Sequence, residues 1–396
     1  MRPVSEARIK KLTHILANFG EGSVDTDSIS LNSEDVLDLY ELANRFWLGA
    51  SLANALTARD DFDRFAPEII AYSKDLSSAA QKRNQLHKEQ TIELVRWLNE
   101  RGIEPLLIKG AAELFDGIDK PQGQRWMMDI DIVIPEDRVK SVWEDIVKDF
   151  GYGLLYNMEF DWSSARWHHA PGLISPSGVS IELHRSITAY ENPFLKKIAK
   201  VDKERINELA DLGLEANQLS PSNKLILAIS HDFISHAHLQ KNIWDLRYSY
   251  TDHLLVTRYK DSLDWNYIQK EFHNNVEALN LAKYILSHYF AQTIESSNTR
   301  ENRLFVEGAI ARLNKSADGL QKGLFLKRVL DYFSPKSVLR GYEKITFFQA
   351  IKLYIPVILS VPKKIIFALP FHGSRGLAIK RFTRHHQPML DDDSDA

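Results

Sequence analysis

The stretch from Pro105 to Ile134, PLLIKGAAELFDGIDKPQGQRWMMDIDIVI, decides the fold. Its first four residues form an apolar run with the length of a buried strand. The turn Lys109-Gly110 ends that run, and the following AAELF continues at helical spacing. After a polar loop, the segment from Arg125 ends in an alternation of acidic and apolar residues, which predicts a second strand.

The second strand divides its side chains between two faces, because successive residues of a strand point in opposite directions. Ile130, Ile132 and Ile134 share the face that we expect in the core, and Asp129 and Asp131 share the other. Adjacent carboxylates repel each other, so a cation between them is expected. Mg²⁺, with Mn²⁺ as a substitute, binds carboxylate oxygens and leaves positions for phosphates. A solvated edge strand is the alternative, since a D-x-D pair is a short motif.

A third acidic ligand is expected from a separate strand. The segment VSIELHR, from Val179 to Arg185, alternates again and places Glu182 and His184 on the face away from the core. We therefore expect Asp129, Asp131 and Glu182 to form a metal-binding and catalytic trio for phosphoryl transfer. One of these carboxylates is also a candidate for the base that accepts the acceptor's proton.

Several residues near the trio are candidates for binding substrates. Lys109-Gly110 lies where a strand meets a helix, and glycine lets the backbone approach a phosphate there. Arg125 is a second cation for phosphate oxygens. Taken singly, each is more typical of a surface cation near acids. His169 and His184 are candidates for an acceptor pocket, with strand capping as the alternative.

A second polar group crowds one predicted helix and consists of His231, Asp232, His236 and His238. The His-Asp pair suggests a metal site of the phosphohydrolase type, but the sequence shows no source for the other ligands. Residues five apart do not share one face of an α-helix. We therefore interpret the group as polar helix surface or a domain contact.

Composition limits the class of protein. The chain has 396 residues, 44% of them hydrophobic and 26% charged, which is typical of globular proteins with two or three domains. A formal net charge of -3 gives no basic footprint, so no stable nucleic-acid partner is expected. The absence of cysteine excludes disulfides and favours a reducing, cytoplasmic location. We expect neither a signal peptide nor a membrane span.

Four regions are expected along the chain. They are an N-terminal helical region (1–80), a mixed-sheet core (81–215), a helical domain (216–330) and an apolar and basic helical segment with an acidic disordered end (331–396). The order of elements in the core predicts an α+β fold. Residues 351–386 suggest a peripheral membrane or protein contact, with a packed C-terminal helix as the alternative.

The order KGAAELF, RWMMDIDIVI, HHAPGLI and VSIELHR resembles the polymerase-beta-type nucleotidyltransferase superfamily. More closely, it resembles a bacterial family of uncharacterised nucleotidyltransferases, over roughly residues 80 to 290. The resemblance implies a minimal nucleotidyltransferase fold with helical flanks. Mg²⁺ would be held by Asp129, Asp131 and Glu182, and a nucleoside triphosphate would lie against Lys109-Gly110. Most of the superfamily has Gly-Ser or Gly-Gly at this turn, so the hydroxyl that usually contacts a phosphate is missing here.

The expected function is transfer of a nucleoside monophosphate from a nucleoside triphosphate to a hydroxyl of an acceptor. A small molecule, peptide or saccharide is favoured over a long nucleic acid. A glycosyltransferase with a D-x-D metal site is one alternative, although it would need a larger sheet before the acids. A non-catalytic interaction module that kept the fold is another, and it should not bind a metal–nucleotide complex.

Overall fold

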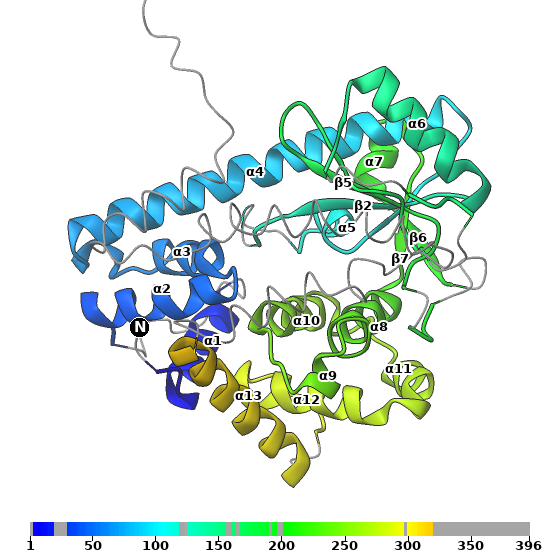
Figure 1. The fold of residues 1–396 in the computed structure, drawn as a ribbon. Helices are drawn as coiled ribbons and strands as arrows, with labels where there is room; N and C mark the ends of the chain where they lie inside the picture. The colour runs from blue at the N-terminus through cyan, green and yellow to red at the C-terminus, as the bar shows by residue number, and fades with distance from the viewer. Residues whose placement is uncertain are drawn as a thin grey trace, which may run out of the picture.

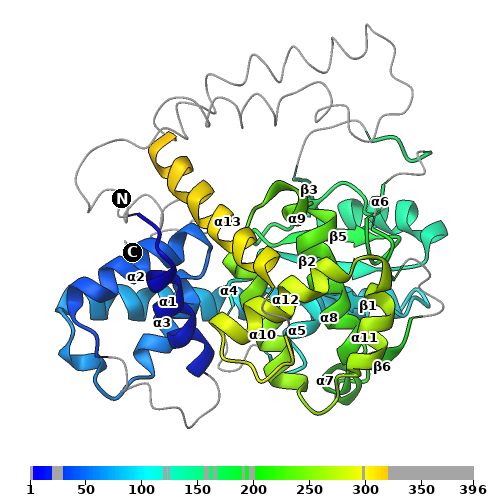
Figure 2. The same ribbon diagram turned by 90° about the horizontal axis from the view of Figure 1, so that it is seen from below.

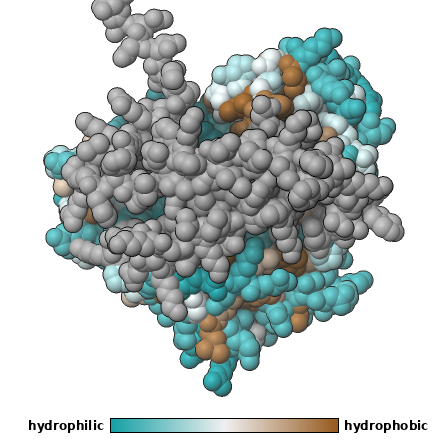
Figure 3. All heavy atoms as spheres, in the orientation of Figure 1, coloured by the Kyte–Doolittle hydropathy of each residue, from teal (hydrophilic) through white to brown (hydrophobic). Residues whose placement is uncertain are grey.

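The computed structural model describes residues 3–19, 30–118, 123, 125–155, 160–163, 167–189, 192–195, 201–296 and 299–319. The C-terminal segment expected at 331–396, with the contact region proposed at 351–386, lies outside these residues. Figure 1 shows N-terminal helices on one side, a sheet on the other, and a second group of helices below the sheet. Figure 3 shows hydrophilic residues around the rim of the described part, with smaller apolar groups among them.

The described residues of the N-terminal part form mainly helices. Its elements are α1 (Glu6–Asn18), α2 (Ser33–Arg45), α3 (Gly49–Thr57), the short 3-10 helix η2 (Phe62–Arg64) and α4 (Pro67–Asn99). A capping box starts α2: Asn32 accepts from the Asp35 N–H, and the Asp35 carboxylate accepts from the Asn32 N–H. Helix α4 is 33 residues long and passes residue 80 without a break, so it connects the N-terminal helices to the sheet (Figure 1).

Among the described residues, seven strands form one mixed sheet in the order β3-β4-β5-β2-β1-β7-β6. They are β1 (Leu106–Ile108), β2 (Asp129–Val133), β3 (Gly153–Leu154), β4 (Leu173–Ile174), β5 (Ser180–His184), β6 (Lys203–Arg205) and β7 (Asn217–Leu219). The pairs β2–β5 and β1–β7 are parallel, and the other pairs are antiparallel. This sheet with its helices confirms the predicted α+β fold.

The remaining helices cover both faces of the sheet. They are α5 (Gly110–Glu113), η3 (Glu136–Arg138), α6 (Val139–Phe150), α7 (Asn207–Asp211), α8 (Pro221–Ser230), the π-helix η5 (His231–Ser235), α9 (His238–Lys241), α10 (Leu246–Tyr259), α11 (Trp265–Glu271), η6 (Phe272–Asn274), α12 (Val276–Tyr289) and α13 (Arg300–Gly319). Figure 2 shows α8, α11 and α12 near one another, with α13 running from α12 towards the N-terminal helices. None of the described helices combines the length and the apolar character needed to cross a bilayer.

The two faces of β2 pack against different apolar clusters. Ile130, Ile132 and Ile134 are buried in the cluster that includes the end of α4 and the apolar face of α6, which confirms them as core residues. Val133 points the other way, into the cluster that contains residues of α8, α10 and α12. Because Asp131 shares the face of Val133, the acidic side of β2 is turned towards the C-terminal helices.

A buried lysine ties those helices to the sheet. The Lys224 ammonium on α8 donates to Oδ2 of Asp116 at 2.6 Å, to Oε1 of Gln218 at 2.9 Å and to the hydroxyl of Tyr259 at 2.7 Å. The Tyr259 hydroxyl also donates to Oδ2 of Asp116 at 2.8 Å. These contacts join α8 and α10 to β7 and to the turn after α5. They therefore fix the C-terminal helices relative to the acidic strands.

We predict that Lys224→Met lowers the free energy of unfolding by about 3 kcal/mol, because it leaves the Asp116 carboxylate buried without its charge partner. The double variant Lys224→Met/Asp116→Asn should lose less than the sum of the two single changes. Urea denaturation measures the free energy of unfolding of the single variants and of the double variant. The control is Lys140→Met, which removes an exposed lysine and should change stability by less than about 0.5 kcal/mol. A Lys224→Met effect as small as that of the control would contradict the prediction.

Candidate active site

The register of two parallel strands assembles the acidic group. Asp131 on β2 lies directly beside Glu182 on β5, and Asp129 lies beside Ser180. Since partners in register share a face, both aspartates and Glu182 project from the same side of the sheet. Asp131, Glu182 and His184 each present a ligand atom within 4.8 Å of the other two. The structure therefore brings together the strands that the sequence singled out.

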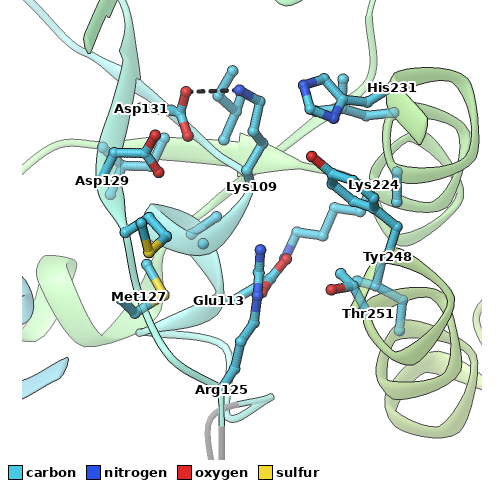
Figure 4. A pocket seen from close by; sticks show the side chains of 18 of the residues that line it. Lys109, Glu113, Arg125, Met127, Asp129, Asp131, Lys224, His231, Tyr248 and Thr251 are labelled. Atoms are coloured by element: carbon cyan, nitrogen blue, oxygen red, sulfur yellow. Dashed lines mark hydrogen bonds and ion pairs between the residues drawn. The ribbon is translucent and has the colours of Figure 1, made fainter. Parts of the chain in front are cut away.

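Two nitrogen groups compensate the charge of Asp131. The Lys109 ammonium, at the end of β1, donates to Oδ1 of Asp131 at 2.8 Å, as Figure 4 shows. The buried His184 ring donates through Nε2 to the same oxygen, also at 2.8 Å. The same Nε2 lies 3.5 Å from Oε2 of Glu182. Lys109 and His184 thus bind the acidic cluster from two sides.

The pKa values of the three carboxyl groups differ because their neighbours differ. Burial works to raise the pKa of Asp131, but Lys109 and His184 outweigh it and hold that pKa well below its usual range. Burial is likewise outweighed at Glu182, whose pKa is lowered mainly by His184 and His169. Burial and the nearby charge of Asp131 raise the pKa of Asp129 to about 6. Asp129 is therefore the least compensated of the three.

The Lys109-Gly110 turn has an unusual backbone. Lys109 has φ 52° and ψ −137°, a conformation that glycine adopts readily and that costs other residues about 1–3 kcal/mol. Gly110 packs tightly: a Cβ there would contact the end of Met127, only 2.8 Å from its sulfur. The turn thus brings a cationic side chain and a bare backbone to the same place.

Helix α4 holds the segment that leads into β2. Arg83 donates to the carbonyl oxygens of Met127 and Met128, the second at 3.2 Å. Asn84 donates to the carbonyl of Arg125 at 2.6 Å and accepts from the N–H of Met127 at 3.2 Å. These hydrogen bonds fix the approach to Asp129, and no motif in the sequence of α4 indicated them.

A cavity of about 970 Å³, its open mouth included, lies between the acidic face and the C-terminal helices (Figure 4). Its lining from the sheet side includes Lys109, Gly110, Arg125, Asp129 and Asp131. Its lining from α8, η5 and α10 includes Leu227, His231, Arg247, Tyr248 and Thr251.

Arg125 lies in the part of the cavity away from Asp131, where it forms an ion pair with Glu113 of α5. Burial works to lower the pKa of Arg125, but Glu113 outweighs it, so the guanidinium stays charged. Sequence reasoning missed Glu113. The only available signal was its place in KGAAELF, three residues after Gly110 and therefore about one helical turn away.

The histidine group at α8 corrects a sequence interpretation. The segment is a π-helix, in which the His236 N–H donates to the His231 carbonyl oxygen, five residues back, at 3.1 Å. The two rings therefore lie on one side, with centroids 4.4 Å apart, and the expectation from α-helical spacing was wrong. His231 lines the cavity. The buried Asp232 instead accepts from Nδ1 of His238 at 2.6 Å.

His169 and His184, like Glu182 beside them, are not among the residues that line the cavity. They face each other in an isolated bridge between their backbones. The His169 ring donates through Nδ1 to the carbonyl of Ala170 at 2.7 Å, and its Nε2 lies 3.9 Å from Oε2 of Glu182. Both rings therefore contact ligands of the expected metal site, and their role in an acceptor pocket stays a prediction.

Comparison with known proteins places the chain in a family. The family described as "Uncharacterised nucleotidyltransferase" matches residues 32–289. No curated protein matches. The antibiotic-resistance factor ANT(2'')-Ia is a similar solved structure, with 13% identity, 49% of this chain and 94% of that chain covered, and a TM-score of 0.33.

A second solved structure is an antigenic nucleotidyltransferase-like protein from Paracoccidioides brasiliensis. It has 16% identity and a TM-score of 0.26, with 52% of this chain and 97% of that chain covered. Both TM-scores are low, so the assignment rests on the family match. Because that match covers more than half of the chain, the protein belongs to the family of uncharacterised nucleotidyltransferases.

Proposed function

We propose that this protein is a metal-dependent nucleotidyltransferase that moves a nucleoside monophosphate from a nucleoside triphosphate onto a hydroxyl of an acceptor. The observation that carries the proposal is the β2–β5 register, which sets Asp131 beside Glu182 with Asp129 on the same face. Their carboxylate oxygens are the donors that suit Mg²⁺, or Mn²⁺ in its place. When bound, the ion would supply positive charge to the phosphate oxygens.

The cavity lining supports a nucleoside triphosphate as the donor. Lys109 and Arg125 bring positive charge to the cavity, and Gly110 presents backbone without a side chain. Helix α5 has only four residues, so its contribution to phosphate binding is expected from backbone N–H groups and not from a long helix dipole. Glu113 holds the Arg125 guanidinium in place, which restricts its approach to one direction.

Glu182 is the proposed base. In the transfer step, the acceptor oxygen forms a bond to the α-phosphorus, the bond from that phosphorus to the β-phosphate oxygen breaks, and pyrophosphate leaves. The acceptor's proton passes to the Glu182 carboxylate, whose lowered pKa keeps it ionised before the step. His184, whose Nε2 lies 3.5 Å from Oε2 of Glu182, restricts the position of this carboxylate. We propose a small molecule, peptide or saccharide as the acceptor.

One other reading has a specific observation behind it. The Lys109 ammonium already neutralises Asp131, which would let a non-catalytic member of the family keep its acids without a metal. Such a protein would not bind a metal–nucleotide complex, so binding separates the two functions. The glycosyltransferase alternative has no such support, because in the described part of the chain the sheet begins at β1, after the N-terminal helices.

We predict that one or more nucleoside triphosphates bind the wild-type protein in the presence of Mg²⁺ and that binding is lost in Asp129→Asn/Asp131→Asn. The amides keep the shape of the site but remove two negative ligands. Calorimetric titration of each of the four nucleotides, with and without Mg²⁺, measures this. Asp137→Asn is the matched control, because it removes an exposed acid just after β2 and should leave binding unchanged. Absence of binding to the wild type in every titration would support the non-catalytic reading.

We also predict that Gly110→Ala weakens nucleotide binding by about tenfold or more, which corresponds to about 1.4 kcal/mol. The added Cβ contacts the end of Met127, a flexible side chain of the cavity wall, which must move. Adding Met127→Ala should restore part of the affinity by removing that contact. Gly153→Ala is the control, since its Cβ meets only Ile174 at an ordinary 3.5 Å. Unchanged affinity in Gly110→Ala would show that nucleotide does not approach this turn.

A further inference from the structure

The charge compensation of the acidic cluster is uneven. Oδ1 of Asp131 receives two hydrogen bonds, one from Lys109 and one from His184. Oε2 of Glu182 lies near the Nε2 atoms of His184 and His169, at 3.5 and 3.9 Å. Nitrogen groups of the chain therefore hydrogen-bond to Asp131 Oδ1 and lie near Glu182 Oε2.

Asp129 is in the opposite situation. Within the described residues, its carboxylate has no hydrogen bond or ion pair, although it lines the cavity beside Asp131 (Figure 4). The second oxygen of Asp131, Oδ2, receives neither of the two hydrogen bonds made to Oδ1. An incoming cation would therefore meet available carboxylate oxygens on the side of Asp129, and nitrogen groups on the side of Glu182.

The position of Lys109 is built into the backbone. Ile108 before it belongs to β1 and is buried, and Gly110 after it is packed against Met127. Lys109, between them, has a positive φ, which is an unfavourable backbone conformation for residues that carry a side chain. A glycine would fit this backbone without strain, so the lysine side chain must provide something that offsets the cost. Its only hydrogen-bond partner among the described residues is Asp131.

We propose that Lys109 is a built-in cation of the catalytic centre, and that it takes the place of a second metal ion. The centre would then bind one divalent ion, held by Asp129 and Oδ2 of Asp131, where a pair of ions would otherwise bridge the three acids. One ammonium and one divalent ion bring three positive charges to three carboxylates, and the His184 ring adds a hydrogen bond to Asp131. This inference rests on the proposed function, because it assumes that a metal binds these acids.

Counting the bound ions tests the proposal. The protein is titrated with Mn²⁺ in the presence of a non-hydrolysable α,β-methylene analogue of the nucleotide that binds. Calorimetry gives the number of ions per chain, and electron paramagnetic resonance shows whether two ions lie close enough to couple. We expect one uncoupled Mn²⁺ in the wild type. In Lys109→Gly, which relieves the backbone strain, and in Lys109→Met, which keeps the side-chain length, we expect two coupled ions.

Two control variants are expected to bind one ion, as the wild type does. Lys109→Arg keeps the positive charge and should still bind one ion, and Lys140→Met removes a distant exposed lysine and should also bind one. A count of two coupled ions in the wild type would overturn the proposal and leave the proposed function standing. A count of one in both Lys109→Gly and Lys109→Met would overturn it as well. If the wild type bound no metal–nucleotide complex at all, the proposed function itself would fail.

If Lys109→Gly and Lys109→Met fold poorly, the number of Mn²⁺ ions bound by the wild type can still overturn the proposal. Loss of Lys109 leaves three acids facing one another, so we expect lower stability without metal and a larger stabilisation by Mn²⁺ than in the wild type. Thermal unfolding with and without Mn²⁺ measures this difference for any variant that can be purified. An equal stabilisation by Mn²⁺ in wild type and variants would contradict the proposed place of Lys109.

Discussion

The mutual repulsion of three carboxylates on one face of a sheet is the constraint on which the site depends. The parallel register of β2 and β5 fixes Asp131 beside Glu182, and burial of Asp131 strengthens the repulsion by excluding water. A folded chain can keep such a cluster only if cations or hydrogen-bond donors approach it. The end of β1 provides Lys109, and β5 itself provides His184. Both donate to Asp131, so Asp129 is the carboxylate whose charge is least compensated.

The helical regions hold in place the other parts of the site around that cluster. Helix α4 reaches from the N-terminal helices to the sheet and fixes the backbone before β2 through Arg83 and Asn84. On the other side, the buried Lys224–Asp116 pair holds α8 and α10 opposite the acids. The cavity lies between the parts of the fold that these two supports hold in place. A change in either helical region should therefore affect substrate binding without touching a carboxylate.

The sequence was sufficient for those features that depend on alternation. Period-2 patterning predicted that Ile130 and Ile132 are buried and that the acids share the opposite face, and both are observed. It could not show that Lys109 contacts Asp131, because that contact depends on the antiparallel pairing of β1 with β2 and on a positive φ. It also missed the shared face of His231 and His236, since a π-helix has no distinct apolar period in five residues.

The lysine of the Lys109-Gly110 turn has a physical explanation in its contact with Asp131. Its backbone conformation is one that favours glycine, so a glycine at this position would suit the local geometry. Substituting lysine adds strain and adds one positive charge 2.8 Å from Asp131. The charge is useful only where the acids are incompletely neutralised by other means. The Lys-Gly turn and the uneven compensation of Asp129 and Asp131 are therefore best understood as two parts of one electrostatic arrangement.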